Sequence, residues 1–171
     1  MKNNSLTIPG VAGKNKIDIH ALAEEWSDYA EITTYLGEEC LKINGVKNLI
    51  LSETIKLSTA TSSVVSFDYA ADSSVIGNYL YFGSNNKMIS FARTFSHTNL
   101  TSGETSNTVL LKISFSSSTP IYIKNLQVEE GTTATDYEPY CDAITDIAVQ
   151  SGGQTKYLKK ITDANNVRLP S

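Results

Sequence analysis

The sequence predicts an all-β protein, an antiparallel β-sandwich of the jelly-roll type. Short apolar stretches are separated by turns rich in serine and threonine. Within these stretches apolar and polar residues alternate, as they do in strands with one buried face. The stretches recur at roughly the 8–12 residues typical of a sandwich or jelly roll. Because no connection between them reads as a helix, antiparallel pairing is expected.

The clearest strand is 108–116, where alternate residues place one apolar face toward the core: Val109, Leu111, Ile113 and Phe115. Further strands are expected at 40–43, 54–58, 64–69 and 88–95. The stretch 78–82 is apolar on both faces, as in a central strand. These segments should supply most of the core.

One segment near the N-terminus follows a helical period instead. Between Asp18 and Ala30, apolar residues recur at helical spacing, and Asp18 is a suitable N-cap. We expect a short helix here. Trp26, the only tryptophan, lies on its apolar face. That position suits either a core residue or an aromatic platform for a sugar.

Composition limits the choice of partners. The chain has 171 residues, of which 40% are hydrophobic and 19% charged, with a net charge of −4. It lacks the basic patch that a nucleic-acid phosphate backbone requires. No apolar run approaches the ~20 residues of a membrane span, and the first residues carry no apolar core of a secretory signal. We therefore expect neither a nucleic acid nor a membrane as partner.

The stretch 121–140, "IYIKNLQVEEGTTATDYEPY", carries the most distinctive pattern in the sequence. Ile121 and Ile123 share a face, but the next apolar residues are Leu126 and Val128, which leaves one residue too many between them. A β-bulge at 124–125 would return the apolar side chains to the core. Acids and a glycine then end the strand. Residues 132–140 should cross the sandwich surface, anchored by Tyr137 and Tyr140.

The same stretch resembles the closing segment of carbohydrate-binding-module-like jelly-roll domains of bacteriophage and prophage tail, baseplate and receptor-binding proteins. The matching pattern is a strand reading Leu-Gln-Val-Glu, a glycine, Ala-Thr and a final Tyr-Glu-Pro-Tyr at 137–140. Residues 66–84 are similar to the paired central strands of these domains. The resemblance spans about residues 30–140. It implies a jelly roll and a virion location, with the host cytoplasm before assembly.

Related modules often hold a structural calcium with acids near the ends of the first and last strands. Here Lys124 and Asn125 stand at the bulge where such modules often carry acids. Calcium sites need several oxygen ligands, and the sequence has no acid cluster such as Asp-x-Asp-x-Asp. We therefore expect no cofactor, with a structural calcium as the alternative. His20 and His97 are likewise not spaced as zinc ligands with each other or with the two cysteines.

The sequence offers no motif for catalysis. The acid pairs 24–25, 38–39 and 129–130 are adjacent residues, whereas glycoside hydrolysis needs two carboxylates facing each other across a cleft. A nucleophile elbow and a phosphate loop are also missing from the sequence. We expect a protein that is not an enzyme.

A sugar-binding surface is the best-supported kind of site. Sugars bind to aromatic rings flanked by polar side chains. The candidate residues come from adjacent expected strands, their connecting loop and the helix: Asn78, Tyr79, Tyr81, Asn85, Asn86, Arg93 and Trp26. The alternative is that the tyrosines pack in the core and that Asn85 and Asn86 form a plain turn.

The expected organisation has three parts: an N-terminal segment with the helix at 1–30, the sandwich at 31–140, and a C-terminal β-hairpin extension at 141–171. A two-stranded unit is only marginally stable by itself. We therefore expect the extension to dock on another protein or to mediate oligomer formation, with a homotrimer as the first expectation. Two functions remain open. One is a non-catalytic carbohydrate-binding accessory or receptor-binding module of a phage particle; the other is a structural head or tail decoration protein without a sugar site.

Overall fold

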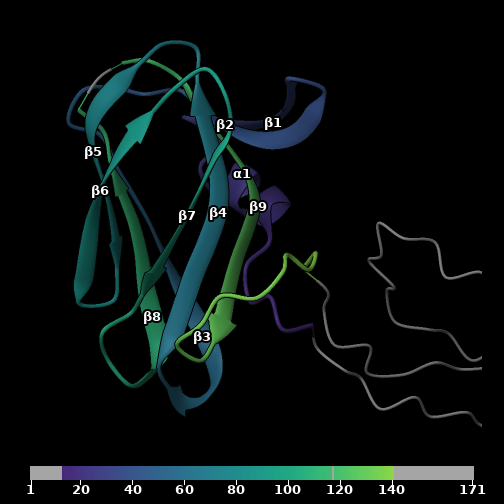
Figure 1. Ribbon diagram of the computed structural model, residues 1–171, viewed down its shortest axis with the longest axis vertical. Helices are drawn as coiled ribbons and strands as arrows, with labels where there is room; N and C mark the ends of the chain where they lie inside the picture. Colours follow the sequence, from purple (N-terminus) through teal and green to yellow (C-terminus); the bar gives the residue numbers. More distant parts are fainter. Residues whose placement is uncertain (1–12, 117, 141–171) are drawn as a thin grey trace, which may run out of the picture. The chain divides into compact units, whose positions relative to one another are not determined.

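Two antiparallel sheets face each other in the computed structural model, which describes residues 13–116 and 118–140 (Figure 1). One sheet has five strands in the order β1-β2-β9-β4-β7: β1 (Ala30–Tyr35), β2 (Glu38–Ile43), β9 (Ile121–Glu130), β4 (Ser63–Ala71) and β7 (Ser96–Thr101). The other has four in the order β3-β8-β5-β6: β3 (Ile50–Thr61), β8 (Ser106–Ser114), β5 (Val75–Phe82) and β6 (Asn85–Phe91). The predicted antiparallel jelly-roll sandwich is confirmed.

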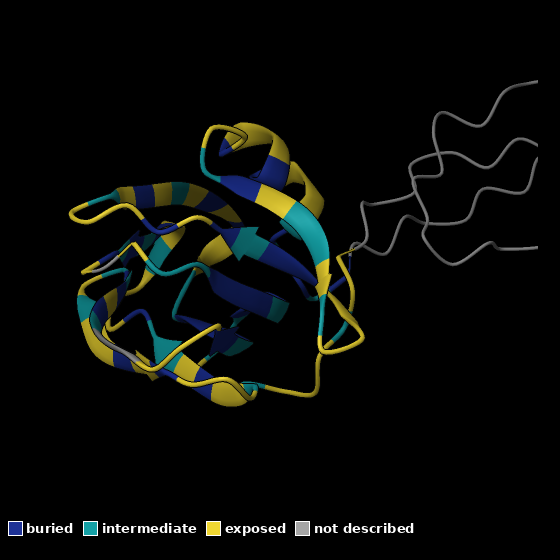
Figure 2. Ribbon diagram, turned by 90° about the horizontal axis from the view of Figure 1, so that it is seen from above, coloured by how far each residue is buried: buried dark blue, intermediate teal, exposed yellow. Residues whose placement is uncertain are grey.

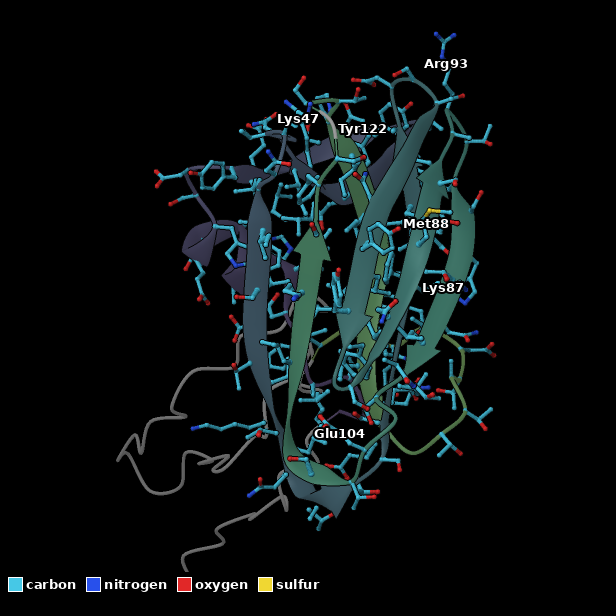
Figure 3. The ribbon with its side chains drawn as sticks, turned by 90° about the vertical axis from the view of Figure 1, so that its left-hand side faces the viewer. Lys47, Lys87, Met88, Arg93, Glu104 and Tyr122 are labelled. Carbon is cyan, nitrogen blue, oxygen red and sulfur yellow. The ribbon has the colours of Figure 1, made fainter. Side chains whose placement is uncertain are left out.

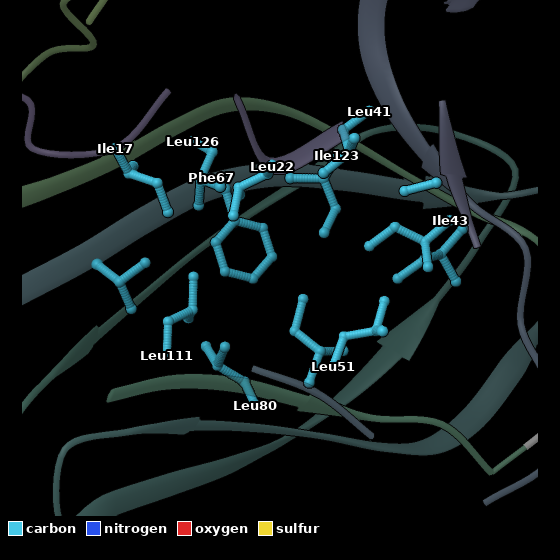
Figure 4. Packing of buried hydrophobic residues seen from close by; sticks show 14 of the residues in the cluster. Ile17, Leu22, Leu41, Ile43, Leu51, Phe67, Leu80, Leu111, Ile123 and Leu126 are labelled. Atoms are coloured by element: carbon cyan, nitrogen blue, oxygen red, sulfur yellow. The ribbon is translucent and has the colours of Figure 1, made fainter. Parts of the chain in front are cut away.

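The core lies between the two sheets and is built from the alternate residues of each strand. Phe67 of β4 and Leu111 of β8 are each 1% exposed, and Figure 4 shows Phe67 among aliphatic side chains from both sheets. In Figure 2 the buried positions alternate along the strands with exposed ones. The predicted inner face of β8 is confirmed, since Val109, Leu111, Ile113 and Phe115 are all buried.

The helix α1 (Ile19–Glu25) joins the two sheets at one side. Asp18 caps it, with its carboxylate accepting a hydrogen bond from the His20 amide at 2.9 Å. Leu22 and Trp26 belong to the core cluster. The helix contacts β1 and β2 of one sheet, while Glu25 interacts with Glu53 on β3 of the other. It therefore packs on β1 and β2 and reaches the other sheet through Glu25.

The predicted bulge in β9 is present. The register between β4 and β9 shifts between Ser66, which pairs with Gln127, and Asp68, which pairs with Lys124. Asn125 takes a positive φ of 52°, a conformation that asparagine tolerates better than most residues. The extra residue returns Leu126 to the core, where it is 3% exposed.

Two expectations about the strands are corrected. The strand expected at 88–95 ends at Phe91, because the chain turns there and the Ala92 carbonyl accepts a hydrogen bond from the Ala71 amide at 2.8 Å. Arg93 and Phe95 therefore lie beyond β6. The stretch 78–82 is not buried on both faces: Leu80 and Phe82 face the core, but Tyr79 is 39% exposed. Strands β1 and β7 are additional to those expected from the sequence.

A compact unit spans Lys14–Tyr140. The C-terminal extension expected at 141–171 lies outside the described residues. In the part of the chain that the structure describes, no helix is long and apolar enough to cross a membrane.

The assignment of strand faces can be tested with adjacent residues of β8. Leu111 is 1% exposed and Leu110 is 43% exposed. We expect Leu111→Ala to lower the free energy of unfolding by about 2–5 kcal/mol, and Leu110→Ala to change it by less than about 0.5 kcal/mol. Phe67→Ala should cost about 3–5 kcal/mol for the same reason. Urea denaturation measures all three; equal losses for the two leucines would show that the faces are assigned wrongly.

Candidate functional site

The outer faces of the two sheets differ sharply in exposure. On the five-stranded sheet many outward side chains are buried, including Val64, Gln127 and Glu129 at 1%, 0% and 4% exposed. On the four-stranded sheet, large apolar side chains remain exposed: Ile50, Tyr79, Met88 and Leu110. Monomeric proteins seldom leave a contiguous apolar patch without a use. The outer face of the four-stranded sheet around Tyr79 and Tyr81, which we call the tyrosine face, is therefore the first candidate site.

Tyr79 and Tyr81 reach this face because successive side chains of a strand point to opposite sides. Between and beyond them, Leu80 and Phe82 point into the core, where both are 0% exposed. The two tyrosine rings lie with centroids 6.2 Å apart and planes tilted by 35°. They form an elongated aromatic surface along β5.

The sheet register places other side chains beside the two rings. Tyr79 pairs with Ser114 of β8 and Met88 of β6, and Tyr81 pairs with Lys112 of β8 and Asn86 of β6. The Lys112 ammonium lies 3.9 Å from the centroid of the Tyr81 ring. This cation–π contact holds the lysine over Tyr81 and keeps its three hydrogen-bond donors at the surface.

Of the candidates from the sequence, Tyr79, Tyr81 and Asn86 are brought together on the tyrosine face. Asn85 is adjacent but engaged, since its amide donates to the Thr101 carbonyl at 3.0 Å. Asn78 is 1% exposed, and its side-chain oxygen accepts from the Ser116 amide at 2.8 Å. Asn78 and Asn85 thus serve local structure.

Two other candidates are not part of this face. Trp26 is 6% exposed and packs in the core, so its ring faces are covered by protein. Arg93 lies beyond the end of β6, where its Nε donates to the Asp72 carbonyl at 2.9 Å. Figure 3 shows it projecting at the end of the sandwich, away from Met88. The proposed sugar site cannot include these two side chains in this arrangement.

Sequence reasoning missed Lys112, Ser114 and Leu110 as members of the tyrosine face. The alternation in 108–116 had already put them on the outward side of β8. What the sequence lacked was the pairing of β8 with β5, which sets Lys112 beside Tyr81. Partners in a sheet that are distant in the sequence cannot be read from alternation alone.

The other outer face is crossed by residues 131–140, which we call the strap. Buried polar side chains of β9 hold it. Gln127 accepts from the Glu138 amide at 2.7 Å, and Glu129 accepts from the Thr135 amide at 3.0 Å. Asn15, 2% exposed, donates to the carbonyls of Leu126 and Glu138 and accepts from the Val128 amide.

The expected anchors of the strap, Tyr137 and Tyr140, are 42% and 37% exposed. Burial of these rings therefore does not account for the position of the strap. The hydrogen bonds that Asn15, Gln127 and Glu129 make with the strap do so instead, because buried side-chain amides and carboxylates must find partners. Glu129 near the end of β9 and Thr135 in the strap thereby acquire a structural role.

A polar cavity of about 460 Å³ lies between the strap and the sheet. Its sheet side is formed by Ser66, Asp68, His97, Asn99 and Asn125, and its other side by strap residues 134–137. We call it the strap pocket. Asp68 is the centre of its hydrogen bonding: His97 Nδ1 lies 2.8 Å from one carboxylate oxygen, and Asn125 Nδ2 donates to the other at 2.7 Å.

In the acid pairs 38–39 and 129–130, each acid has a separate structural partner. Glu38 pairs with Lys124 at 3.1 Å and Glu39 with His20 at 3.4 Å. Glu130 accepts from the Ser58 amide, and Glu129 holds the strap. Glu25 and Glu53, which are distant in the sequence, form a carboxyl pair. Burial and the neighbouring Glu25 raise the pKa of Glu53.

At the bulge, Lys124 brings a positive charge and pairs with Glu38, and the Asn125 amide nitrogen donates to Asp68. Across residues 13–116 and 118–140, no three or more His, Cys, Asp or Glu side chains gather as a metal site.

Comparison with known proteins gives similarity of fold only. No protein-family model matches the chain, and no curated protein matches it. A structure described as "CBM4 structure and function" is 12% identical, with a TM-score of 0.46, over 71% of this chain and 97% of that one. A carbohydrate-binding module from Cellvibrio mixtus lichenase 5A, in complex with cellotriose, is 9% identical with a TM-score of 0.44, over 74% and 100%.

The enzymatically active domain of tailspike protein 4 of bacteriophage CBA120 is also similar, at 11% identity and a TM-score of 0.40, over 58% of this chain and 16% of that one. Structural neighbours thus include carbohydrate-binding modules and one phage tailspike. At TM-scores below 0.5, these likenesses carry no argument about what this chain binds.

We expect the strap to become less stable at low pH, when Glu129 is protonated. Burial by itself raises the pKa of this carboxyl, but hydrogen bonds from Thr135 and Gln127 and the nearby Lys14 outweigh it and lower the pKa below the ordinary 4.5. A lowered pKa means that the carboxylate stabilises the strap above about pH 4.5, and that this stabilisation is lost as the pH falls through the lower folded-state value.

We expect the Thr135 amide resonance to titrate only below pH 4.5 in NMR spectra, as its carboxylate acceptor becomes protonated. Glu129→Gln should abolish this titration while leaving that of the Ser58 amide, which reports on Glu130. A Thr135 titration that persists in Glu129→Gln would mean that another group controls the strap.

Proposed function

We propose that this protein is a non-catalytic carbohydrate-binding module that binds a glycan chain along the tyrosine face. The observation that carries the proposal is the pair of tyrosine rings 6.2 Å apart on an exposed sheet face. Aromatic rings bind the apolar C–H faces of sugars, and a few polar groups beside them fix the orientation. Two rings in line along β5 suit a chain of sugars better than a single one.

The two rings are not equivalent in this proposal. The Lys112 ammonium occupies one side of the Tyr81 ring. A sugar therefore stacks chiefly on Tyr79, while Lys112 and Asn86 donate hydrogen bonds to hydroxyl groups beside Tyr81. An open and shallow face yields little affinity per site after the costs of desolvation and ordering. Useful binding then requires several copies that act together.

We propose further that the module belongs to a phage particle and serves in receptor binding there. Support comes from the closing segment 121–140, whose sequence resembles that of phage tail and baseplate domains. The partners would be a cell-surface polysaccharide and other virion proteins, and the location would be the virion, with the host cytoplasm before assembly.

A structural decoration protein remains the second candidate. The observation in its favour is the exposed apolar set around the tyrosines, with Ile50 and Met88 at 56% and 54% exposed. Such residues also suit a protein interface, whose centre is depleted in charge. On this view the tyrosine face binds a virion protein instead of a glycan.

A glycan array with substituted proteins distinguishes the two. We expect the wild type to bind at least one polysaccharide, Tyr79→Ala to weaken that binding by roughly tenfold, and Tyr79→Phe to retain most of it because the ring remains. Val46→Ala, at a residue that is 48% exposed in the loop between β2 and β3, is the control.

Circular dichroism should show that all three variants fold. If the wild type binds no glycan, or if folded Tyr79→Ala binds as well as the wild type, the tyrosine face is not a sugar site. Binding of the wild type to a purified virion protein, lost in Tyr79→Ala, would then favour the decoration function.

Assembly is a separate proposal. The extension 141–171 carries apolar residues for which we expect partners, and closed symmetry is the usual form of homo-oligomers. Light scattering should therefore give an oligomer, with a trimer as the first expectation, for the full chain and a folded monomer for a chain that ends at Tyr140. A monomeric full chain would remove self-assembly and leave the extension as a docking segment for another protein.

A further inference from the structure

The strap pocket has the features of a second ligand site, on the opposite sheet from the tyrosine face. We propose that it binds a single sugar ring, such as the terminal unit of a glycan, independently of the tyrosine face. The cavity of about 460 Å³ falls in the range of ligand pockets, roughly 300–1,000 Å³.

The chemistry of the pocket wall selects this class of ligand. Asp68 offers acceptor oxygens, the amides of Asn99 and Asn125 and the Ser66 hydroxyl each both donate and accept, and His97 adds a ring nitrogen. A sugar ring presents hydroxyl groups that likewise donate and accept in every direction. Tyr137, 42% exposed in the strap, provides an aromatic face against which the apolar side of the ring can pack.

Other ligand classes fit the same wall less well. An anion would meet the Asp68 carboxylate. A metal ion would have to compete for both Asp68 oxygens. One lies 2.8 Å from His97 Nδ1, and the other accepts a hydrogen bond from the Asn125 amide at 2.7 Å. A purely apolar ligand would leave the carboxylate and amides of the wall without partners, which is costly when they are removed from water. A neutral polyhydroxylated ring avoids all three penalties.

The pocket is also held in place before any ligand arrives. Asp68 is fixed from two sides by the imidazole of β7 and the amide of the bulge in β9. The bulge places Asn125 at a positive φ of 52°, and backbone strain of this kind tends to occur at functional sites. On the other side, Glu129 fixes Thr135 of the strap. Preorganisation of this kind lowers the ordering cost of binding.

The test is an NMR titration of the full chain with single sugars, each at up to tens of millimolar: galactose, glucose, mannose, rhamnose, N-acetylglucosamine and N-acetylgalactosamine. We expect at least one of them to shift the backbone resonances of Asp68, His97, Asn99 and strap residues 134–137. Resonances of Tyr79 and Tyr81 should stay unchanged at the same concentrations.

His97 and Asn99 are exposed, so substituting them should leave the fold intact. His97→Ala and Asn99→Ala should each weaken binding of that sugar by roughly tenfold, the effect of losing one or two hydrogen bonds. The matched controls His20→Ala and Asn44→Ala, both at exposed residues outside the pocket, should leave it unchanged. Tyr79→Ala should also leave it unchanged, which separates this site from the tyrosine face.

The proposal is overturned if none of the six sugars shifts the pocket resonances, or if His97→Ala and Asn99→Ala bind like the wild type. Either result leaves the function of the tyrosine face standing, because that function is read from glycan chains and from Tyr79→Ala. Conversely, pocket shifts with an inert tyrosine face would support this site alone.

Discussion

The bulge at Lys124 and Asn125 in β9 is the constraint on which both faces of the five-stranded sheet depend. It inserts one residue between Ile123 and Leu126, so that both return to the core at 1% and 3% exposed. Without it, the residues after the bulge would exchange faces, because side chains alternate with a period of two. Gln127 and Glu129 would then point into the apolar core instead of holding the strap.

The same bulge links the core to the strap pocket. By turning the Asn125 amide toward Asp68, it supplies one of the two contacts that fix this carboxylate. Strand β9 lies between β2 and β4, so it is paired on both sides and cannot easily shift. Pairing with β2 and β4 therefore fixes the position of the bulge along β9.

The two sheets of the sandwich end up with unlike outer faces. Much of the five-stranded sheet is covered by the strap and by stacked rings. The ring centroids of Tyr35 and Tyr122, for example, lie 3.9 Å apart. The four-stranded sheet keeps Tyr79, Leu110 and Met88 exposed. A face crossed by a strap can form a pocket for one ring, whereas a bare face offers an extended surface. This difference is the reason for assigning a chain-like ligand to one and a single unit to the other.

The sandwich, the faces of β8, the short helix and the bulge could all be predicted from the sequence. Each follows from the spacing of apolar residues within or between neighbouring segments, and such local periodicity survives in any tertiary context that buries one face. The sequence also named Tyr79 and Tyr81 as candidate rings, but left open whether they lie in the core or at the surface. In the structure, the packing of the two sheets buries Leu80 and Phe82, and the two tyrosines therefore face outward.

The remaining features depend on contacts between distant parts of the chain. Tertiary structure placed Trp26 and Asn78 in the interior, brought Lys112 over Tyr81, and assembled Asp68, His97 and Asn125 from three strands. It also gave the polar run after β9 its role, through Asn15 at the other end of the described chain. The physical reason is common to all of these: each contact joins residues distant in the sequence, and strand order and register, which periodicity does not encode, determine which of them meet.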